Sequence, residues 1–241
     1  ATRKKGDAYA QYFSAVFETS GLFAGSAGIG MALGRAGPDP QPAYIRRNRR
    51  HVRCRSRTRR PAGNLGVLLF PGFEMLDAYG PMEMWGSLKH APDRFWGEAS
   101  DRVGIRLVTV AATKGPVPSN QGPKTVADFD YTDAPALDYL LVPGGIGVTP
   151  LVSDPATLNW LRAQAKNTSL AMSVCNGASL LAAAGLLDGR AATTNKMAFK
   201  ASIAPGPKVR WVASARWVDN GNVVTSSGVS AGMDMTVAVI A

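Results

Sequence analysis

Residues 170–187 carry the pattern from which the architecture can be predicted, and they read LAMSVCNGASLLAAAGLL. A short apolar run leads to Cys175, small residues follow at Gly177 and Ala178, and apolar residues then recur with helical spacing. This order predicts a buried strand that turns sharply into a helix, with the thiol of Cys175 at the turn.

The predicted position of Cys175 has a chemical consequence. At a helix N-terminus the unpaired backbone amides and the helix dipole favour an anion, so we expect a lowered thiol pKa and some thiolate near neutral pH. Gly177 and Ala178 would let the backbone bend tightly and leave space above the sulfur. The alternative for a lone cysteine after an apolar strand is a buried structural role.

Strand-like and helix-like segments alternate around this stretch. Strands are expected at residues 65–70, 105–112, 137–142, 169–174, 191–194, 209–212, 215–218 and 222–226, with a loop or edge ribbon at 117–125. Helices are expected at residues 76–88, 155–165, after Cys175, at 196–203 and at 230–241. Asp154 before Pro155 is a typical helix start, and Asp219-Asn220-Gly221 a typical hairpin turn. This order predicts an α/β three-layer sandwich over residues 62–241, with a mostly parallel sheet.

The excess positive charge of the chain is confined to its first quarter. The net charge is +10, and residues 1–60 contain 13 Lys and Arg against 3 Asp and Glu, whereas residues 61–241 contain 14 of each kind. We expect residues 1–61 to form a basic, disordered N-terminal extension. The run Arg46–Arg60 could neutralise phosphates or act as a targeting signal. It lacks interleaved aromatic residues, so nucleic acid is not expected as a partner.

The cysteine content and the hydropathy of the sequence indicate where in the cell the protein is expected. The two cysteines, Cys54 and Cys175, lie in segments of different character, which excludes a disulfide framework and favours a reducing compartment. No run approaches the roughly 18 apolar residues that a membrane helix needs. We therefore expect a soluble, cytoplasmic protein that does not bind membranes.

Several polar or small residues follow the predicted strands, where ligands of parallel sheets gather. They are Asp77, the pair Gly144-Gly145, Cys175 and the pair Thr194-Asn195. Adjacent glycines after a strand can point backbone amides at a ligand or a developing negative charge. We therefore predict that Gly144 and Gly145 bind substrate or an oxyanion.

Asp77 either adds a favourable negative charge to the first turn of its helix or lies beside Cys175, and the second position has a chemical consequence. Two negative charges at that distance cannot both be favourable, so the pair would share one proton, with the charge on the thiolate and the proton on Asp77. Neither His51, in the arginine run, nor His90, beyond the first helix, is placed to serve as an imidazole base. No cluster with metal-ligand spacing occurs, so no metal is expected.

Six spaced motifs can be compared with a known family. They are Phe70-Pro71 through Leu76-Asp77 and Gly80-Pro81, Val142-Pro143-Gly144-Gly145, Ser173-Val174-Cys175-Asn176-Gly177, Gly185-Leu186-Leu187-Asp188-Gly189, Ala192-Thr193-Thr194 and Ser227-Gly228-Val229-Ser230-Ala231-Gly232-Met233-Asp234. In this order they resemble the DJ-1/ThiJ/PfpI superfamily of class I glutamine-amidotransferase-like domains. The resemblance covers residues 64–241.

Within this superfamily the aspartate of the first motif and the Ser-Val-Cys turn are most similar to isocyanide hydratases. That similarity implies that the Cys175 thiolate attacks the isocyanide carbon, that Asp77 supplies the proton, and that water completes an N-substituted formamide. Asn176 and Asn195 become further candidates for binding substrate. The resemblance also implies a flavodoxin-like fold, a homodimer and no cofactor.

The sequence departs from the resemblance at three places. Asn176 stands where isocyanide hydratases carry threonine, Asn195 stands where many superfamily members carry histidine, and the last helix continues further in relatives. We therefore expect a shortened C-terminal end. Three other interpretations stay open. They are a glyoxalase or deglycase acting on α-oxoaldehydes, a redox-sensing stress protein in which Asp77 stabilises an oxidised Cys175, and the sensing half of a regulator with DNA contacts elsewhere.

Overall fold

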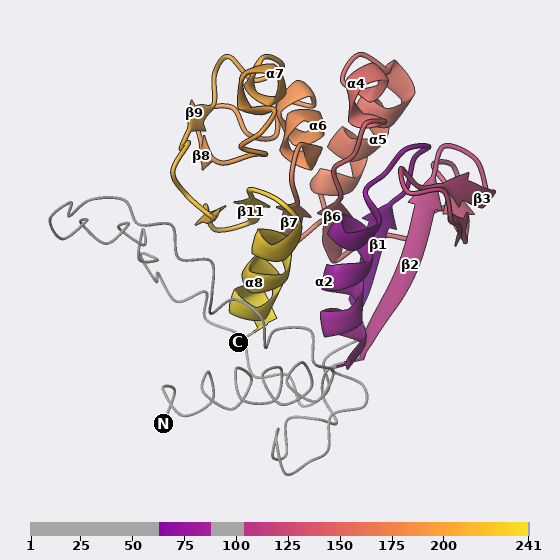
Figure 1. The fold of residues 1–241 in the computed structure, drawn as a ribbon. Coiled ribbons are helices and arrows are strands. Elements are labelled where there is room, and N and C mark those ends of the chain that lie inside the picture. Colours follow the sequence, from indigo (N-terminus) through magenta and orange to yellow (C-terminus); the bar gives the residue numbers. More distant parts are fainter. Residues whose placement is uncertain (1–62, 88–103, 241) are drawn as a thin grey trace, which may run out of the picture.

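The computed structural model describes residues 63–87 and 104–240, and its central feature is a seven-stranded sheet (Figure 1). The strand order is β10-β11-β7-β6-β1-β2-β5. These strands are β1 (Gly63–Leu68), β2 (Ile105–Ala111), β5 (Phe129–Asp130), β6 (Tyr139–Val142), β7 (Leu170–Ser173), β10 (Trp217–Asp219) and β11 (Val223–Ser226). All neighbours are parallel except β10 and β11, which form an antiparallel pair. The predicted mostly parallel sheet and the predicted hairpin turn are confirmed.

Helices cover the sheet, as the alternating pattern predicts. They are α2 (Met75–Ser87), α4 (Val148–Leu151), α5 (Pro155–Ala165), α6 (Gly177–Ala183), α7 (Phe199–Ile203) and α8 (Val229–Ile240). The pair α2 and α8 lies side by side, and α5 packs against α6 (Figure 1). Asp154 caps α5 as predicted, because its side chain accepts a hydrogen bond from the Thr157 N–H at 2.8 Å and Pro155 begins the first turn.

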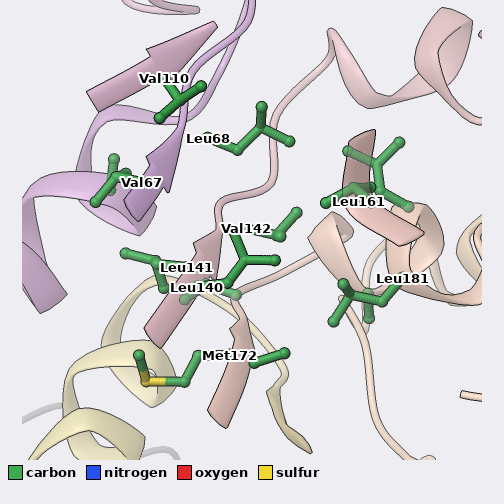
Figure 2. Packing of buried hydrophobic residues seen from close by; sticks show 14 of the residues in the cluster. Val67, Leu68, Val110, Leu140, Leu141, Val142, Leu161, Met172 and Leu181 are labelled. Atoms are coloured by element: carbon green, nitrogen blue, oxygen red, sulfur yellow. The ribbon is translucent and has the colours of Figure 1, made fainter. Parts of the chain in front are cut away.

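The core lies between the sheet and its helices. Leu140, Leu141 and Val142 of β6 are fully buried, as expected for a strand covered on both faces. Leu161 of α5 and Leu181 of α6 belong to the same core cluster as this strand (Figure 2). The continuous apolar runs of the sequence therefore correspond to central strands rather than to half-exposed ones.

Two regions differ from the elements expected from the sequence. Residues 191–194 and 209–212 were expected as strands, and the structure pairs only β8 (Ala191–Ala192) with β9 (Arg210–Trp211), in a separate two-stranded sheet. The ribbon expected at 117–125 is a hairpin of β3 (Gly115–Pro118) and β4 (Lys124–Ala127). The short elements β5 and α4 were not predicted, because two or four residues are too few to show a periodicity.

The N-terminal extension falls outside the described residues, and with it Cys54, His51 and the arginine run; the same is true of His90. In the part of the chain that the structure describes, no helix is long and apolar enough to cross a membrane.

Strand register aligns the turns that carry the candidate site. Val142 of β6 pairs with Ser173 of β7, so Gly144 and Cys175 each lie two residues beyond a paired position. The next strand on the other side of β6 is β1, whose chain continues into α2 and Asp77. Three neighbouring strands therefore bring their carboxyl ends to one edge of the sheet, as in other parallel α/β folds.

Candidate active site

Cys175 occupies a tight turn between β7 and α6. Among residues 63–87 and 104–240 it is the one non-glycine residue with a positive φ, of 58°. Such a conformation persists only where the surroundings hold it. Here the Cys175 N–H donates to the carbonyl of Ser226 at 3.1 Å, and the Thr194 hydroxyl donates to the Cys175 carbonyl at 3.0 Å. The predicted strand–turn–helix is confirmed, with the half-buried thiol at its turn.

Gly177 is what permits the turn to pack closely. A Cβ at this position would lie 2.3 Å from the carbonyl oxygen of Val142 and 2.6 Å from that of Pro143. Contacts this short do not occur between real atoms, so any larger residue would push α6 away from β6. Gly177 does not have a positive φ, so the structure attributes the need for glycine here to close packing rather than to the expected bend.

Asp77 is fully buried in the first turn of α2. Its Oδ2 accepts a hydrogen bond from the Gly144 N–H at 3.0 Å, while its Oδ1 is buried and has no hydrogen-bond partner among the described residues. Burial raises the pKa of Asp77 to about 7, and the negative charge of Glu74 adds to this effect. The hydrogen bonds from Gly144 and from the Cys175 thiol act in the opposite direction. A carboxyl group that titrates near neutrality can both donate and accept a proton.

The protonation order of the pair differs from the expectation. Burial raises the pKa of the Cys175 thiol to about 11, and the charge of Asp77 raises it further. The expected lowering of the thiol pKa is therefore wrong, because burial and the charge of Asp77 outweigh the hydrogen bonds from Asn176 and Asn195 that favour the thiolate. Asp77 has the lower pKa of the two, so the carboxyl group loses its proton before the thiol does.

Gly144 and Gly145 line the same site, but their N–H groups already have partners within the protein. The Gly144 N–H donates to Asp77, and the Gly145 N–H donates to Oδ1 of Asn176 at 2.8 Å. The expectation that both amides point at a substrate anion does not hold in this structure. The reason is that Asp77 and Asn176 supply acceptors that the sequence does not place.

Space around Gly144 is as tight as around Gly177. A Cβ on Gly144 would lie 2.4 Å from Oδ1 of Asn176, 2.7 Å from Cβ of Cys175 and 2.8 Å from Oδ2 of Asp77. These distances place Gly144 between the three polar side chains of the site. Only a glycine can occupy this position while those side chains keep their contacts.

Asn195 reaches the sulfur from the segment after β8. Its Nδ2 donates to Sγ of Cys175 at 2.9 Å, and its Oδ1 accepts from the Ala198 N–H at 2.8 Å. The structure therefore brings all the predicted site residues together around one thiol. Two neighbours of the site were not predicted, namely Glu74, which acts through its charge, and Ser226, whose carbonyl holds the Cys175 N–H. The sequence offers one signal for Glu74, its position three residues before Asp77, and none for Ser226.

Histidine, cysteine and carboxylate side chains do not gather elsewhere into a possible metal centre. In the part of the chain that the structure describes, no three such side chains come close enough to hold one ion. The chemistry available at this edge of the sheet therefore consists of a thiol, a carboxyl group with a raised pKa, and amide donors.

Comparison with known proteins places this arrangement in a family. The isonitrile hydratase of Pseudomonas putida is 37% identical over 171 residues, which are 70% of this chain and 67% of that protein. A crystal structure of a ThiJ/PfpI family protein from Pseudomonas syringae is 28% identical with a TM-score of 0.61, and the match covers 75% of this chain and 68% of that one.

Transcription regulators are also similar to this chain. The HTH-type transcriptional regulator GbdR of Pseudomonas aeruginosa is 30% identical over 177 residues, which are 73% of this chain and 46% of the regulator. The family model of the DJ-1/PfpI family matches residues 65–241, a range that contains the Cys175 site and nearly all of the described sheet and helices. This chain therefore belongs to the DJ-1/PfpI family.

Proposed function

We propose that this chain is a cysteine-dependent enzyme that uses no cofactor and hydrates isocyanides to N-substituted formamides. In this proposal Cys175 is the nucleophile and Asp77 carries the proton. The observation that carries it is the pairing of the Cys175 thiol with a buried carboxyl group whose pKa is raised to about 7. The similarity to an isonitrile hydratase supports the choice of substrate.

The pair supplies a nucleophile only when a proton moves within it. Near neutral pH the thiol keeps its proton, because its pKa is far above 7, while Asp77 is partly ionised. When a substrate approaches the sulfur, the Asp77 carboxylate accepts the thiol proton and a thiolate forms. The charge stays within one buried pair, so no additional charge is desolvated.

The reaction then proceeds in two additions. The thiolate forms a C–S bond to the terminal isocyanide carbon, and Asp77 returns the proton to that carbon, which leaves a thioimidate on Cys175. Water next adds to the same carbon as Asp77 takes one of its protons and passes it to the substrate nitrogen. When the C–S bond breaks, the remaining hydroxyl proton returns through Asp77 to the sulfur, and an N-substituted formamide is released. One water is consumed, and both side chains return to their starting protonation.

A second candidate function is a sensing domain that binds a small molecule without converting it. The similarity to GbdR, of which this chain matches 46%, favours this candidate. The same thiol and amide donors would then bind a ligand, and the response would depend on affinity rather than turnover. A glyoxalase or deglycase acting on α-oxoaldehydes is the remaining enzyme candidate.

The test is steady-state turnover of an aromatic isocyanide and of methylglyoxal. We expect isocyanide consumption with formamide production by the wild type, none by Cys175→Ala, and a rate lower by about 10²- to 10⁴-fold for Asp77→Asn. Cys54→Ser and Asp188→Asn are the matched controls for loss of a thiol and of an exposed carboxylate.

Other outcomes of this experiment would reject the proposal. Turnover of methylglyoxal alone would favour the glyoxalase candidate. Folded wild-type protein that consumes neither compound but binds the isocyanide reversibly would favour the sensing domain. Equal isocyanide turnover by Cys175→Ala and the wild type would remove Cys175 from the mechanism.

A further inference from the structure

The side chain of Asn195 makes one contact at each end. Its Nδ2 donates to Sγ of Cys175 at 2.9 Å, and its Oδ1 accepts from the Ala198 N–H at 2.8 Å, just before α7. The Ala198 bond fixes which end of the amide faces the sulfur, because a backbone N–H can only donate. The neighbouring Thr194 donates its hydroxyl to the Cys175 carbonyl, so the same segment is held against Cys175 at two points.

We infer that Asn195 is a thiolate-stabilising residue, whose amide N–H favours the ionised form of Cys175, rather than a residue that recognises substrate. An N–H donor contributes more to a hydrogen bond when the acceptor is charged. Its contact is therefore strengthened as the sulfur becomes negative and weakened when the sulfur is protonated or alkylated. The side chain is already oriented by Ala198, so little reorganisation accompanies the change.

The charges near the sulfur make such a donor necessary. Glu74, just before α2, opposes a thiolate through its negative charge, and Asp77 of α2 does so whenever its carboxyl group is ionised. Lys196, which follows Asn195 in the chain, directs its Nζ to the hydroxyl of Thr193 and lies over the ring of Phe199.

The groups that favour an anion at Cys175 are neutral amides. They are the side chain of Asn195 and the backbone N–H of Asn176. A neutral amide does not titrate between pH 4 and 11, unlike an imidazole at the same place. The ionisation of Cys175 is thus coupled to that of Asp77, while the contribution of Asn195 stays constant with pH.

The test is the pH dependence of alkylation of Cys175 by iodoacetamide. The rate is followed on the Cys175 peptide by mass spectrometry, so that Cys54 does not contribute. Asn195→Ala should raise the pH midpoint by about one unit or more, and so lower the rate at neutral pH by about tenfold, as expected when a hydrogen bond to a charged group is lost. Met197→Ala is the control, because Met197 is in the same segment and 98% exposed.

Asn195→Asp tests whether the side chain at position 195 acts on the sulfur while its contact with Ala198 is kept. An aspartate keeps the acceptor for the Ala198 N–H but replaces the donor to the sulfur by a negative charge. If Asn195 stabilises the thiolate, Asn195→Asp should raise the midpoint further than Asn195→Ala does. If the side chain of residue 195 does not act on the sulfur, Asn195→Asp should behave as the wild type. Repeating the series with Asp77→Asn removes the coupled titration, so that the midpoint belongs to the thiol alone.

The inference rests on the proposed role of Cys175 as the reacting thiol, but its readout needs no isocyanide turnover. A protein inactive toward isocyanides that still shows the two shifts would reject the hydratase and keep the role of Asn195. An unchanged midpoint in Asn195→Ala, or a wild-type midpoint in Asn195→Asp, would overturn the inference. Near-UV circular dichroism checks folding, and Asn195→Leu, similar in size and without polar atoms, replaces any variant that does not fold.

Discussion

Asn176 and Gly145 exchange two hydrogen bonds across the candidate site. The Gly145 N–H donates to Oδ1 of Asn176 at 2.8 Å, and Nδ2 of Asn176 donates to the Gly145 carbonyl at 3.0 Å. These two hydrogen bonds connect the turn after β6 to the turn after β7. The residue that follows the thiol therefore has both polar ends of its side chain engaged within the protein.

Asn176→Ala should loosen the connection between the two turns. Two hydrogen bonds are lost in a partly buried position, so we expect the free energy of unfolding to fall by about 1–3 kcal/mol. Turnover per folded molecule should also fall, because Gly144, whose N–H donates to Asp77, lies next to Gly145. Urea unfolding and steady-state kinetics measure the two effects. An activity unchanged within twofold would show that the pairing does not position the site.

Gly144→Ala should damage the site directly. The added Cβ would meet Asn176, Cys175 and Asp77 at 2.4–2.8 Å, so at least one of these side chains must move. We expect turnover of the accepted substrate to fall at least tenfold, with slower alkylation of Cys175. The matched control is Gly228→Ala, where an added Cβ meets nothing within 4 Å. Equal losses in both variants would mean that steric contact at Gly144 is not the cause.

Asp77 should make the folded protein less stable as the pH rises from about 4 to 7. The pKa of Asp77 is raised from 3.8 to about 7, so in this range the unfolded chain has lost the proton that the folded chain still holds. The free energy of unfolding therefore decreases with pH, by roughly 4 kcal/mol in total for a shift of about three units. Urea unfolding at several pH values measures this slope.

Two variants show whether this slope belongs to Asp77. Asp77→Asn cannot ionise, so its stability should change less between pH 4 and 7 than that of the wild type. Asp188→Asn removes instead the exposed carboxylate that pairs with Lys208, and controls for the loss of one negative charge. The same slope in Asp77→Asn as in the wild type would contradict the raised pKa.

Asp154→Ala should destabilise α5 at its N-terminus. The Asp154 carboxylate accepts from both the backbone N–H and the hydroxyl of Thr157, which also lower its pKa. Loss of such a cap typically costs about 1 kcal/mol, measured by thermal or urea unfolding at pH 7. Asp154→Asn keeps an acceptor oxygen and should lose less. If both variants lost the same amount, charge rather than capping would be the cause.

Much of the fold can be predicted from local patterns. The buried runs of β1, β6 and β7 are continuous apolar segments, the start of α5 is a typical cap, and the hairpin between β10 and β11 has a typical turn. Each of these signals depends on neighbouring residues only. The short elements β5, β8 and β9 depend on pairing with distant strands, which explains why their bounds or partners were not predicted.

The candidate site, like the fold, has features that local sequence patterns predict and features that they do not. Residues 170–187 by themselves imply a strand, a thiol at a tight turn and a helix, because apolar periodicity and small residues act locally. The sequence also implies that Asp77, Gly144 and Asn195 reach the same edge, since the carboxyl ends of parallel strands meet there.

Only the tertiary structure decided the protonation of the site and the partners of its amides. The pKa of Cys175 is raised rather than lowered because side chains and backbone from distant segments exclude water from it, and because Asp77 lies beside it. The N–H groups of Gly144 and Gly145 face Asp77 and Asn176 because three strand ends pack within a few ångströms. Desolvation and hydrogen-bond pairing depend on what surrounds a group in space, and that is decided when the whole chain folds.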